Sequence, residues 1–189
     1  MDDALAGEVL AFWFGPPPHA PRDVWFRKDA AFDATIRERF GIGVDKALAG
    51  AYGDWCVSAH GSLARVLMLD QFTRNSFRDT AKAFAGDARA LATSVDAIER
   101  GFEAALDPCE RWFLYLPFEH SEDAGMQARS LERFEALARE PGFDGPLDYA
   151  KRHAAVIARF GRFPHRNAAL GRESTDAERE FLRQPGSSF

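Results

Sequence analysis

Apolar side chains recur along this chain every three or four positions, which is the spacing of one face of an α-helix. This period predicts helices over residues 4–14, 29–40, 44–49, 63–75, 87–101, 108–116, 122–139, 149–160 and 176–183. No stretch shows the period of two that a half-buried strand needs. The pattern therefore predicts an all-α fold of antiparallel helical hairpins, and by itself it leaves a bundle and a solenoid both open.

Several predicted helices begin at residues that can cap them. Asp3 is placed to cap the first helix, and Ser121 is placed to cap the helix over 122–139. Asp107, followed by Pro108 and Glu110, has the pattern of a capping box with proline in the first turn. The helix that starts at Pro108 is apolar nearly all round, so we expect it to be the most buried element.

Glycine and proline mark the predicted ends. Gly41 and Gly43 are expected to break the second helix before a short helix over 44–49. Pro117 is expected to kink or end the apolar helix, because proline removes a backbone donor and clashes with the preceding turn. Gly161 is expected to end the helix over 149–160.

The stretch 63–75 changes character along one helical face. Leu63, Val66 and Leu67 begin this face with apolar side chains, and Asp70 and Arg74 continue it. In the simplest interpretation the acid and the base form a surface ion pair worth about 0.3–0.5 kcal/mol. The shared face favours partial burial instead, and a buried ion pair is a costly choice for stability alone. The sequence leaves open whether this pair has a structural or a functional role.

Glu119, His120 and Glu122 directly follow the apolar helix. The carboxylates can hold the imidazole in one tautomer or raise its pKa for general-acid work, and all three side chains are of metal-ligating types. Alternatively, the two acids only favour the positive end of the next helix. No HExxH or comparable spacing supports a metal, so none is expected. His153 lies on an apolar stripe and is interpreted as a hydrogen-bonded core residue.

Arg162, His165, Arg166 and Asn167 follow another predicted helix. Cationic side chains after a helix C-terminus can simply cap it and form salt bridges. If this segment lies beside Arg74, its cations would instead form an anion site for a carboxylate or a phosphate.

Composition narrows the classes of partner. The 189 residues suffice for one domain with a substantial core, and the net charge of −5 gives nucleic-acid binding no overall support. The longest apolar run, residues 112–118, is far short of the roughly 20 residues that a membrane helix needs. The start M-D-D is acidic where a signal peptide is basic, and Cys56 and Cys109 lack paired spacing. We therefore expect a cytoplasmic protein with reduced cysteines and no nucleic-acid or membrane partner.

Four strings occur in a specific order: L-D-Q-F-T-R-N from Leu69, F-L-Y-L-P-F-E-H-S-E-D from Phe113, R-F-G-R-F-P-H-R-N from Arg159, and the closing P-G-S-S-F. With them the chain resembles the bacterial domain-of-unknown-function family number nine-two-four, and V-L-A-F-W-F-G at Val9 extends the match to essentially the whole chain. The resemblance implies a TPR-like right-handed superhelix, as a single domain over residues 1–189, and no particular activity. Thr73 departs from the pattern, where proline is expected in many members.

We predict that the three polar segments meet in one concave pocket. The leading hypothesis is that Arg74, Arg162 and Arg166 hold a small anionic ligand or a peptide end, with Trp13 or Phe118 as a wall. The residues expected to form the pocket are Asp70, Arg74, Asn75, Glu119, His120, Arg162, His165, Arg166 and Asn167.

Two alternatives use the same residues. The first is a metal-independent hydrolase or other acid–base enzyme, with catalytic candidates His120, Glu119 and His165. The second is an interaction scaffold in which the polar residues only fix the packing of helices, and no protein partner is indicated. The sequence shows no cofactor motif. The tail, residues 184–189, is hypothesised to dock Phe189 in the groove.

Overall fold

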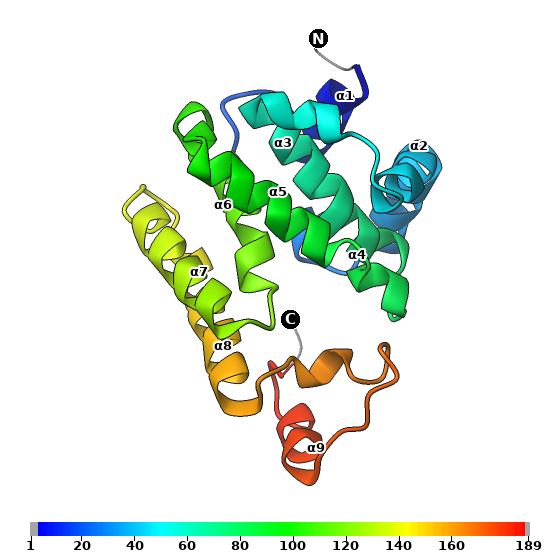
Figure 1. Cartoon of the computed structure of the whole chain (residues 1–189), viewed down its shortest axis with the longest axis vertical. Helices are drawn as coiled ribbons and strands as arrows, with labels where there is room; N and C mark the ends of the chain where they lie inside the picture. The colour runs from blue at the N-terminus through cyan, green and yellow to red at the C-terminus, as the bar shows by residue number, and fades with distance from the viewer. Residues whose placement is uncertain (1–3, 188–189) are drawn as a thin grey trace.

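The structure is a computed structural model that describes residues 4–187, so Asp3 and the tail residue Phe189 lie outside the described residues. Within this range all regular structure is helical and no β-strand occurs, as predicted (Figure 1). The α-helices are α1 (Ala4–Phe14), α2 (Ala30–Leu48), α3 (Ala59–Val66), α4 (Thr73–Ser76), α5 (Asp87–Glu99), α6 (Pro108–Glu119), α7 (Ala124–Leu137), α8 (Gly145–Phe160) and α9 (Asp176–Leu182). Short 3₁₀ turns are η1 (Asp23–Trp25), η2 (Gly53–Val57), η4 (Ala81–Phe84), η5 (Phe102–Ala105) and η6 (Pro164–Arg166), and η3 (Leu67–Phe72) is π-helical.

Consecutive helices pack beside one another. The pair α7 and α8 lies side by side, and α6 contacts α3, α5, α7 and α8 (Figure 1). At the other end of the chain, α9 packs on η6. The TPR-like right-handed path and the single domain over residues 1–189 stay predictions. Across residues 4–187, no helix combines the length and apolarity that crossing a membrane requires.

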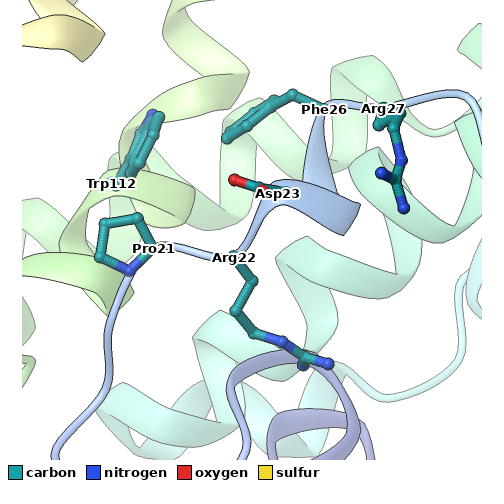
Figure 2. Close-up of a pocket in the computed structure, with 6 residues that line it drawn as sticks. All are labelled: Pro21, Arg22, Asp23, Phe26, Arg27 and Trp112. Carbon is teal, nitrogen blue, oxygen red and sulfur yellow. The ribbon is translucent and has the colours of Figure 1, made fainter.

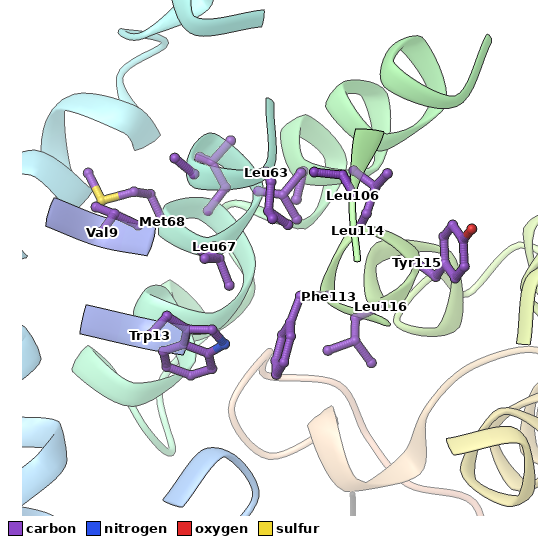
Figure 3. Packing of buried hydrophobic residues seen from close by; sticks show 14 of the residues in the cluster. Val9, Trp13, Leu63, Leu67, Met68, Leu106, Phe113, Leu114, Tyr115 and Leu116 are labelled. Carbon is purple, nitrogen blue, oxygen red and sulfur yellow. The ribbon is translucent and has the colours of Figure 1, made fainter. Parts of the chain in front are cut away.

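Large aromatic rings join the N-terminal helices to α6. Trp13 and Phe113 are buried in the main core cluster (Figure 3), with ring centroids 5.3 Å apart. Trp25 packs its ring 4.7 Å from Phe113, and its Nε1 donates to the Trp13 carbonyl at 2.9 Å. Edge-to-face ring contacts and a satisfied indole N–H are how buried tryptophans are usually held. This cluster fixes α6, and with it the residues at the end of α6.

The capping box predicted at Asp107 is confirmed. The helices predicted over 63–75 and 149–160 begin earlier than expected, since α3 starts at Ala59 and α8 at Gly145. Asp107 and Glu110 form the reciprocal capping box of α6, and Thr175 and Glu178 form that of α9. Gly161 ends α8 with a φ of 67°, in the left-handed region that glycine adopts without strain.

The predicted break at Gly41 and Gly43 is wrong, because α2 runs continuously from Ala30 to Leu48. A glycine inside a helix costs about 0.5–1 kcal/mol but leaves the backbone hydrogen bond intact, so tertiary packing can offset it. Gly43 is buried against Met68, where an added Cβ would lie 2.8 Å from the methyl carbon. The glycine serves close packing of α2 on η3.

Two boundaries near the polar segments also differ from prediction. Pro117 does not end α6, which continues to Glu119 and uses His120 as its C-cap. The next helix, α7, is capped by Asp123, whose side chain accepts from the Met126 N–H at 2.9 Å, and not by Ser121. The extra turn of α6 directs Glu119 into the buried interior.

Candidate functional site

Asp70 lies in the π-helical segment η3, which interrupts the helical run from α3 to α4 and is buried throughout. Gly86 packs directly against this segment, since a Cβ there would lie 2.0 Å from the Leu69 carbonyl oxygen. The Thr73 hydroxyl donates to the carbonyls of Leu69 and Asp70, at 2.7 and 3.0 Å. These contacts satisfy carbonyl groups where the regular ladder is interrupted. π-Helical turns of this kind are frequent at functional sites.

Three side chains surround the buried carboxylate of Asp70. His120 Nδ1 lies 2.7 Å from Oδ1, Gln71 Nε2 donates to Oδ2 at 2.6 Å, and Arg74 Nη1 lies 3.1 Å from Oδ1. Burial opposes ionisation, but the charge of Arg74 and the contacts with His120 outweigh it and hold the pKa of Asp70 far below its usual range. Asp70 is therefore an ionised acceptor that fixes the groups around it.

Asp87, at the start of α5, extends this arrangement. It accepts two hydrogen bonds from Arg74, at 2.8 and 3.1 Å, and a third from Arg166 at 3.1 Å. The Arg166 guanidinium also lies over the Phe84 and Phe163 rings, at 4.8 and 4.4 Å. We call the connected set the Asp70 network, which consists of Asp70, Gln71, Arg74, Asp87, His120 and Arg166. Its two arginines and two aspartates balance in charge.

Glu119 and two further histidines lie beside this network. Glu119 is 3% exposed, its Oε1 lies 3.1 Å from His153 Nδ1, and its Oε2 has no hydrogen-bond partner among the described residues. Burial and the Asp70 charge raise the pKa of Glu119 to about 8. Burial and the neighbouring His120 lower the pKa of His153 to about 3, and burial with the charge of Arg166 lowers that of His165 to about 3. At neutral pH this region therefore holds a protonated carboxyl group and neutral imidazoles.

His120 lies between the Asp70 network and the cluster of Glu119 and His153. Its side chain is 14% exposed, and its ring centroid lies 6.1 Å from that of His153. Burial and the charge of Arg74 lower the pKa of His120, although the contact with Asp70 opposes this change. The carboxylate that orients His120 is thus Asp70, whereas the sequence pointed to Glu119 or Glu122. Glu122 instead pairs with Arg172 at 2.7 Å.

The structure brings together Asp70, Arg74, Glu119, His120, His165 and Arg166 of the predicted set, through direct contacts or neighbouring charges. It does not bring in Asn75, which donates to Asp33 at 2.7 Å. Arg162 and Asn167 instead contact Glu178, at 2.6 and 3.4 Å. These three side chains hold the ends of helices together away from the network, so the predicted clamp lacks its third arginine.

Three contributors were missed or assigned otherwise from the sequence. Asp87 has no signal there beyond an acid in the first turn of a helix. Gln71 follows Asp70 directly, and the sequence marks it as a further hydrogen-bonding group without identifying its partner. His153 was interpreted as a core residue, and it is buried with its Nδ1 2.9 Å from the Tyr149 carbonyl. Its approach to Glu119 depends on the packing of α8 on α6, which no local pattern states.

Among residues 4–187, two groups of side chains have metal-ligand atoms within 4.8 Å of one another: Glu119 with His120 and His153, and His19 with Asp107 and Glu110. In the first group both Nδ1 atoms already have partners, and the charges of Arg74 and Arg166 lie nearby. A metal ion held through these Nδ1 atoms would have to displace the contacts with Asp70 and with the Tyr149 carbonyl.

Among the surface cavities of the described residues, two lie away from the Asp70 network. One, of about 510 Å³, is lined by Pro21, Arg22, Asp23, Phe26, Arg27 and Trp112 (Figure 2). The other, of about 530 Å³, is lined by Arg159, Phe160, Arg162, Thr175, Ala177 and Glu178. Trp13 and Phe118, expected as pocket walls, are fully buried and belong to the core. That expectation is therefore wrong, and Phe84 and Phe163 are the rings beside the network.

Comparison with known proteins agrees with the sequence resemblance. The family model described as "Bacterial protein of unknown function (DUF924)" matches residues 9–186. A solved structure, of the protein of unknown function ATU0120 from Agrobacterium tumefaciens, superposes with a TM-score of 0.85 at 41% identity. The match covers 95% of this chain and 97% of that one. No curated protein matches the chain. The chain therefore belongs to the bacterial family of unknown function DUF924.

Proposed function

We propose that this chain is an acid–base enzyme in which His120 is the general base and Asp70 holds it in position. The observation that carries this proposal is the 2.7 Å contact between His120 Nδ1 and Asp70 Oδ1. An ionised carboxylate only accepts hydrogen bonds, so Nδ1 carries the proton and Nε2 keeps its lone pair. A neutral imidazole in this tautomer can take a proton from water or from a substrate hydroxyl.

The neighbouring protonation states support the same role. The lowered pKa of His120 keeps it a base at neutral pH, and the pKa of about 8 keeps Glu119 an acid. Environments that separate the pKa values of adjacent groups in this way are typical of acid–base sites. Oε2 of Glu119 has no hydrogen-bond partner among the described residues, so we propose that it carries the proton.

Arg74 is the residue best placed to stabilise developing negative charge. It lies between Asp70 and Asp87 and is 19% exposed, so one guanidinium contacts the base-orienting carboxylate and reaches the surface. Loss of a single donor to a developing oxyanion typically costs about 10²–10³-fold in rate. We propose that Arg74 supplies this donor.

The predicted anion-binding function has less support. Arg74 and Arg166 already share Asp87, and Arg162 is paired with Glu178. A stable anion would need the full charge of a guanidinium that Asp70 and Asp87 already neutralise. A developing oxyanion on a substrate beside His120 needs only one N–H donor of Arg74, and a guanidinium has five. The free cysteines are consistent with the cytoplasmic setting that we also propose.

Turnover by the full chain tests the proposal. The probes are p-nitrophenyl acetate, p-nitrophenyl phosphate and an amino-acid p-nitroanilide, all assayed in EDTA. We expect His120→Ala and Asp70→Asn to lower turnover about 10²–10⁴-fold. The matched control is Asp45→Asn, at an aspartate 60% exposed and paired with Lys82 at 2.8 Å, which should retain full activity.

Two results would reject this function. The first is turnover that His120→Ala leaves unchanged. The second is an inert wild type in which His120→Ala lowers the free energy of unfolding by more than about 3 kcal/mol, because such a loss is expected when a buried structural network is broken. That second result would favour the scaffold hypothesis.

A further inference from the structure

A second cluster of polar side chains lies at the beginning of α6, outside the Asp70 network. His19, from the loop after α1, has its Nδ1 2.6 Å from Asp107 Oδ2 and 3.8 Å from Glu110 Oε1. His60, from α3, has its Nε2 3.4 Å from the same Glu110 oxygen. Three segments that are distant in sequence therefore bring two imidazoles to two carboxylates.

The capping box of α6 holds both carboxylates in place. Asp107 Oδ1 accepts from the Glu110 N–H, and Glu110 Oε2 accepts from the Asp107 N–H, each at 3.0 Å. This reciprocal pairing uses one oxygen of each acid. The second oxygens, Asp107 Oδ2 and Glu110 Oε1, are the ones that face the histidines.

The oxygen atom Glu110 Oε1 indicates that this cluster can bind a ligand. The side chain is only 6% exposed, and no hydrogen bond reaches this oxygen from the described residues. Its distances of 3.4 and 3.8 Å to the imidazole nitrogens are long for hydrogen bonds. They are close to the roughly 3.4 Å that separates two ligands of a tetrahedral ion with bonds of about 2.1 Å.

We propose that His19, Asp107 and Glu110, whose ligand atoms lie within 4.8 Å of one another, bind a divalent metal ion of the zinc class. His60, which is 56% exposed and contacts Glu110 alone, would turn towards the ion as the fourth donor. Zinc accepts imidazole nitrogens together with carboxylate oxygens, whereas calcium and magnesium are bound mainly by oxygen ligands. Two imidazoles and two carboxylates therefore favour an ion of the zinc class. On binding, His19 moves away from Asp107 Oδ2, since a distance of 2.6 Å is a hydrogen bond and not a ligand–ligand separation. The bound ion would tie the loop after α1 and helix α3 to the start of α6.

Zinc binding to the full-length, EDTA-treated protein tests this site, by isothermal titration with zinc chloride. We expect one zinc ion per chain with a Kd below about 10 μM. His60→Ala and Glu110→Gln should each weaken binding at least about 10-fold, because each removes a donor. Glutamine at this position can still complete the capping box, so Glu110→Gln tests the ligand without removing the cap. Glu38→Gln, at an exposed position on α2, is the matched control.

The second group of possible metal ligands, Glu119 with His120 and His153, provides the decisive comparison. If His120→Gln abolishes zinc binding while His60→Ala and Glu110→Gln retain it, the ion binds beside the Asp70 network and the proposal is wrong. Binding that survives all three substitutions identifies an adventitious surface ion and equally overturns it. The absence of saturable binding by the wild type would do the same.

Discussion

The buried carboxyl group of Glu119 offers a direct test of the electrostatics of the site. Replacing it by glutamine preserves the shape of the protonated side chain and removes its ability to ionise. Below pH 4.5 the folded and unfolded wild type both keep this proton, so the carboxyl contributes fully to stability there. As pH rises towards 8, the unfolded chain releases the proton while the folded chain must keep it, and stability falls. Glu119→Gln should therefore become progressively more stable relative to wild type as pH rises.

The magnitude follows from the raised pKa. The interval from the ordinary value of 4.5 to about 8 spans about 3.5 pH units, each worth about 1.4 kcal/mol. The full effect is thus at most about 5 kcal/mol, and about 3 kcal/mol falls between about pH 5.5 and 8.5. With 3% exposure, the side chain has little solvent to screen the effect. The histidines beside it titrate in both proteins, so their contributions largely cancel in the difference.

Urea denaturation of both proteins across this pH range measures the difference. Glu38→Gln, the same substitution at an exposed position on α2, controls for the chemical change itself. A stability difference between Glu119→Gln and wild type that stays constant with pH would refute the argument. It would mean that Glu119 ionises in the folded protein as easily as in the unfolded chain.

Two further predictions concern packing. Phe113→Ala should lower the free energy of unfolding by about 3–5 kcal/mol in denaturant titrations, because a ring 1% exposed leaves a cavity. The same change at Phe26, 58% exposed, should cost less than about 1 kcal/mol, and equal losses would contradict the assigned core. Gly86→Ala should cost about 1–3 kcal/mol or more in Tm-monitored unfolding, since its Cβ would meet the Leu69 carbonyl. Gly7→Ala, with open space around it in α1, should stabilise by about 0.5–1 kcal/mol, and a gain at both glycines would contradict the close approach.

The fold class was predictable because helix signals are local. The Asp107 capping box and the Gly161 terminator lie within a few residues of what they control, and both are confirmed. Gly43 and Pro117 were misjudged for the opposite reason. Each has an unfavourable local propensity that distant packing offsets, by Met68 against Gly43 and by the buried surroundings of α6.

Only those residues of the candidate site that share one helical face could be predicted together from the sequence. The face that carries Asp70 and Arg74 was evident from spacing, and both are buried or nearly so in the network. Spacing could not show that Asp87 would balance Arg74 and Arg166, because that contact depends on how α5 and η6 meet α4. A cation count alone therefore suggested an anion clamp where the structure has a neutralised network.

The π-helical segment also explains why the spacing of apolar residues could not predict the direction in which the Asp70 side chain points. A period of 3.6 residues assumes an unbroken α-helix, whereas η3 inserts a wider turn at Asp70. The groups that accommodate this turn are the Thr73 hydroxyl and the bare Cα of Gly86, and neither residue carries a local signal of this role. Their meaning depends on the Leu69 carbonyl that both approach. The carboxylate that orients His120 is thus set by a backbone irregularity, and its effect is seen only when α4, α5 and α6 are assembled.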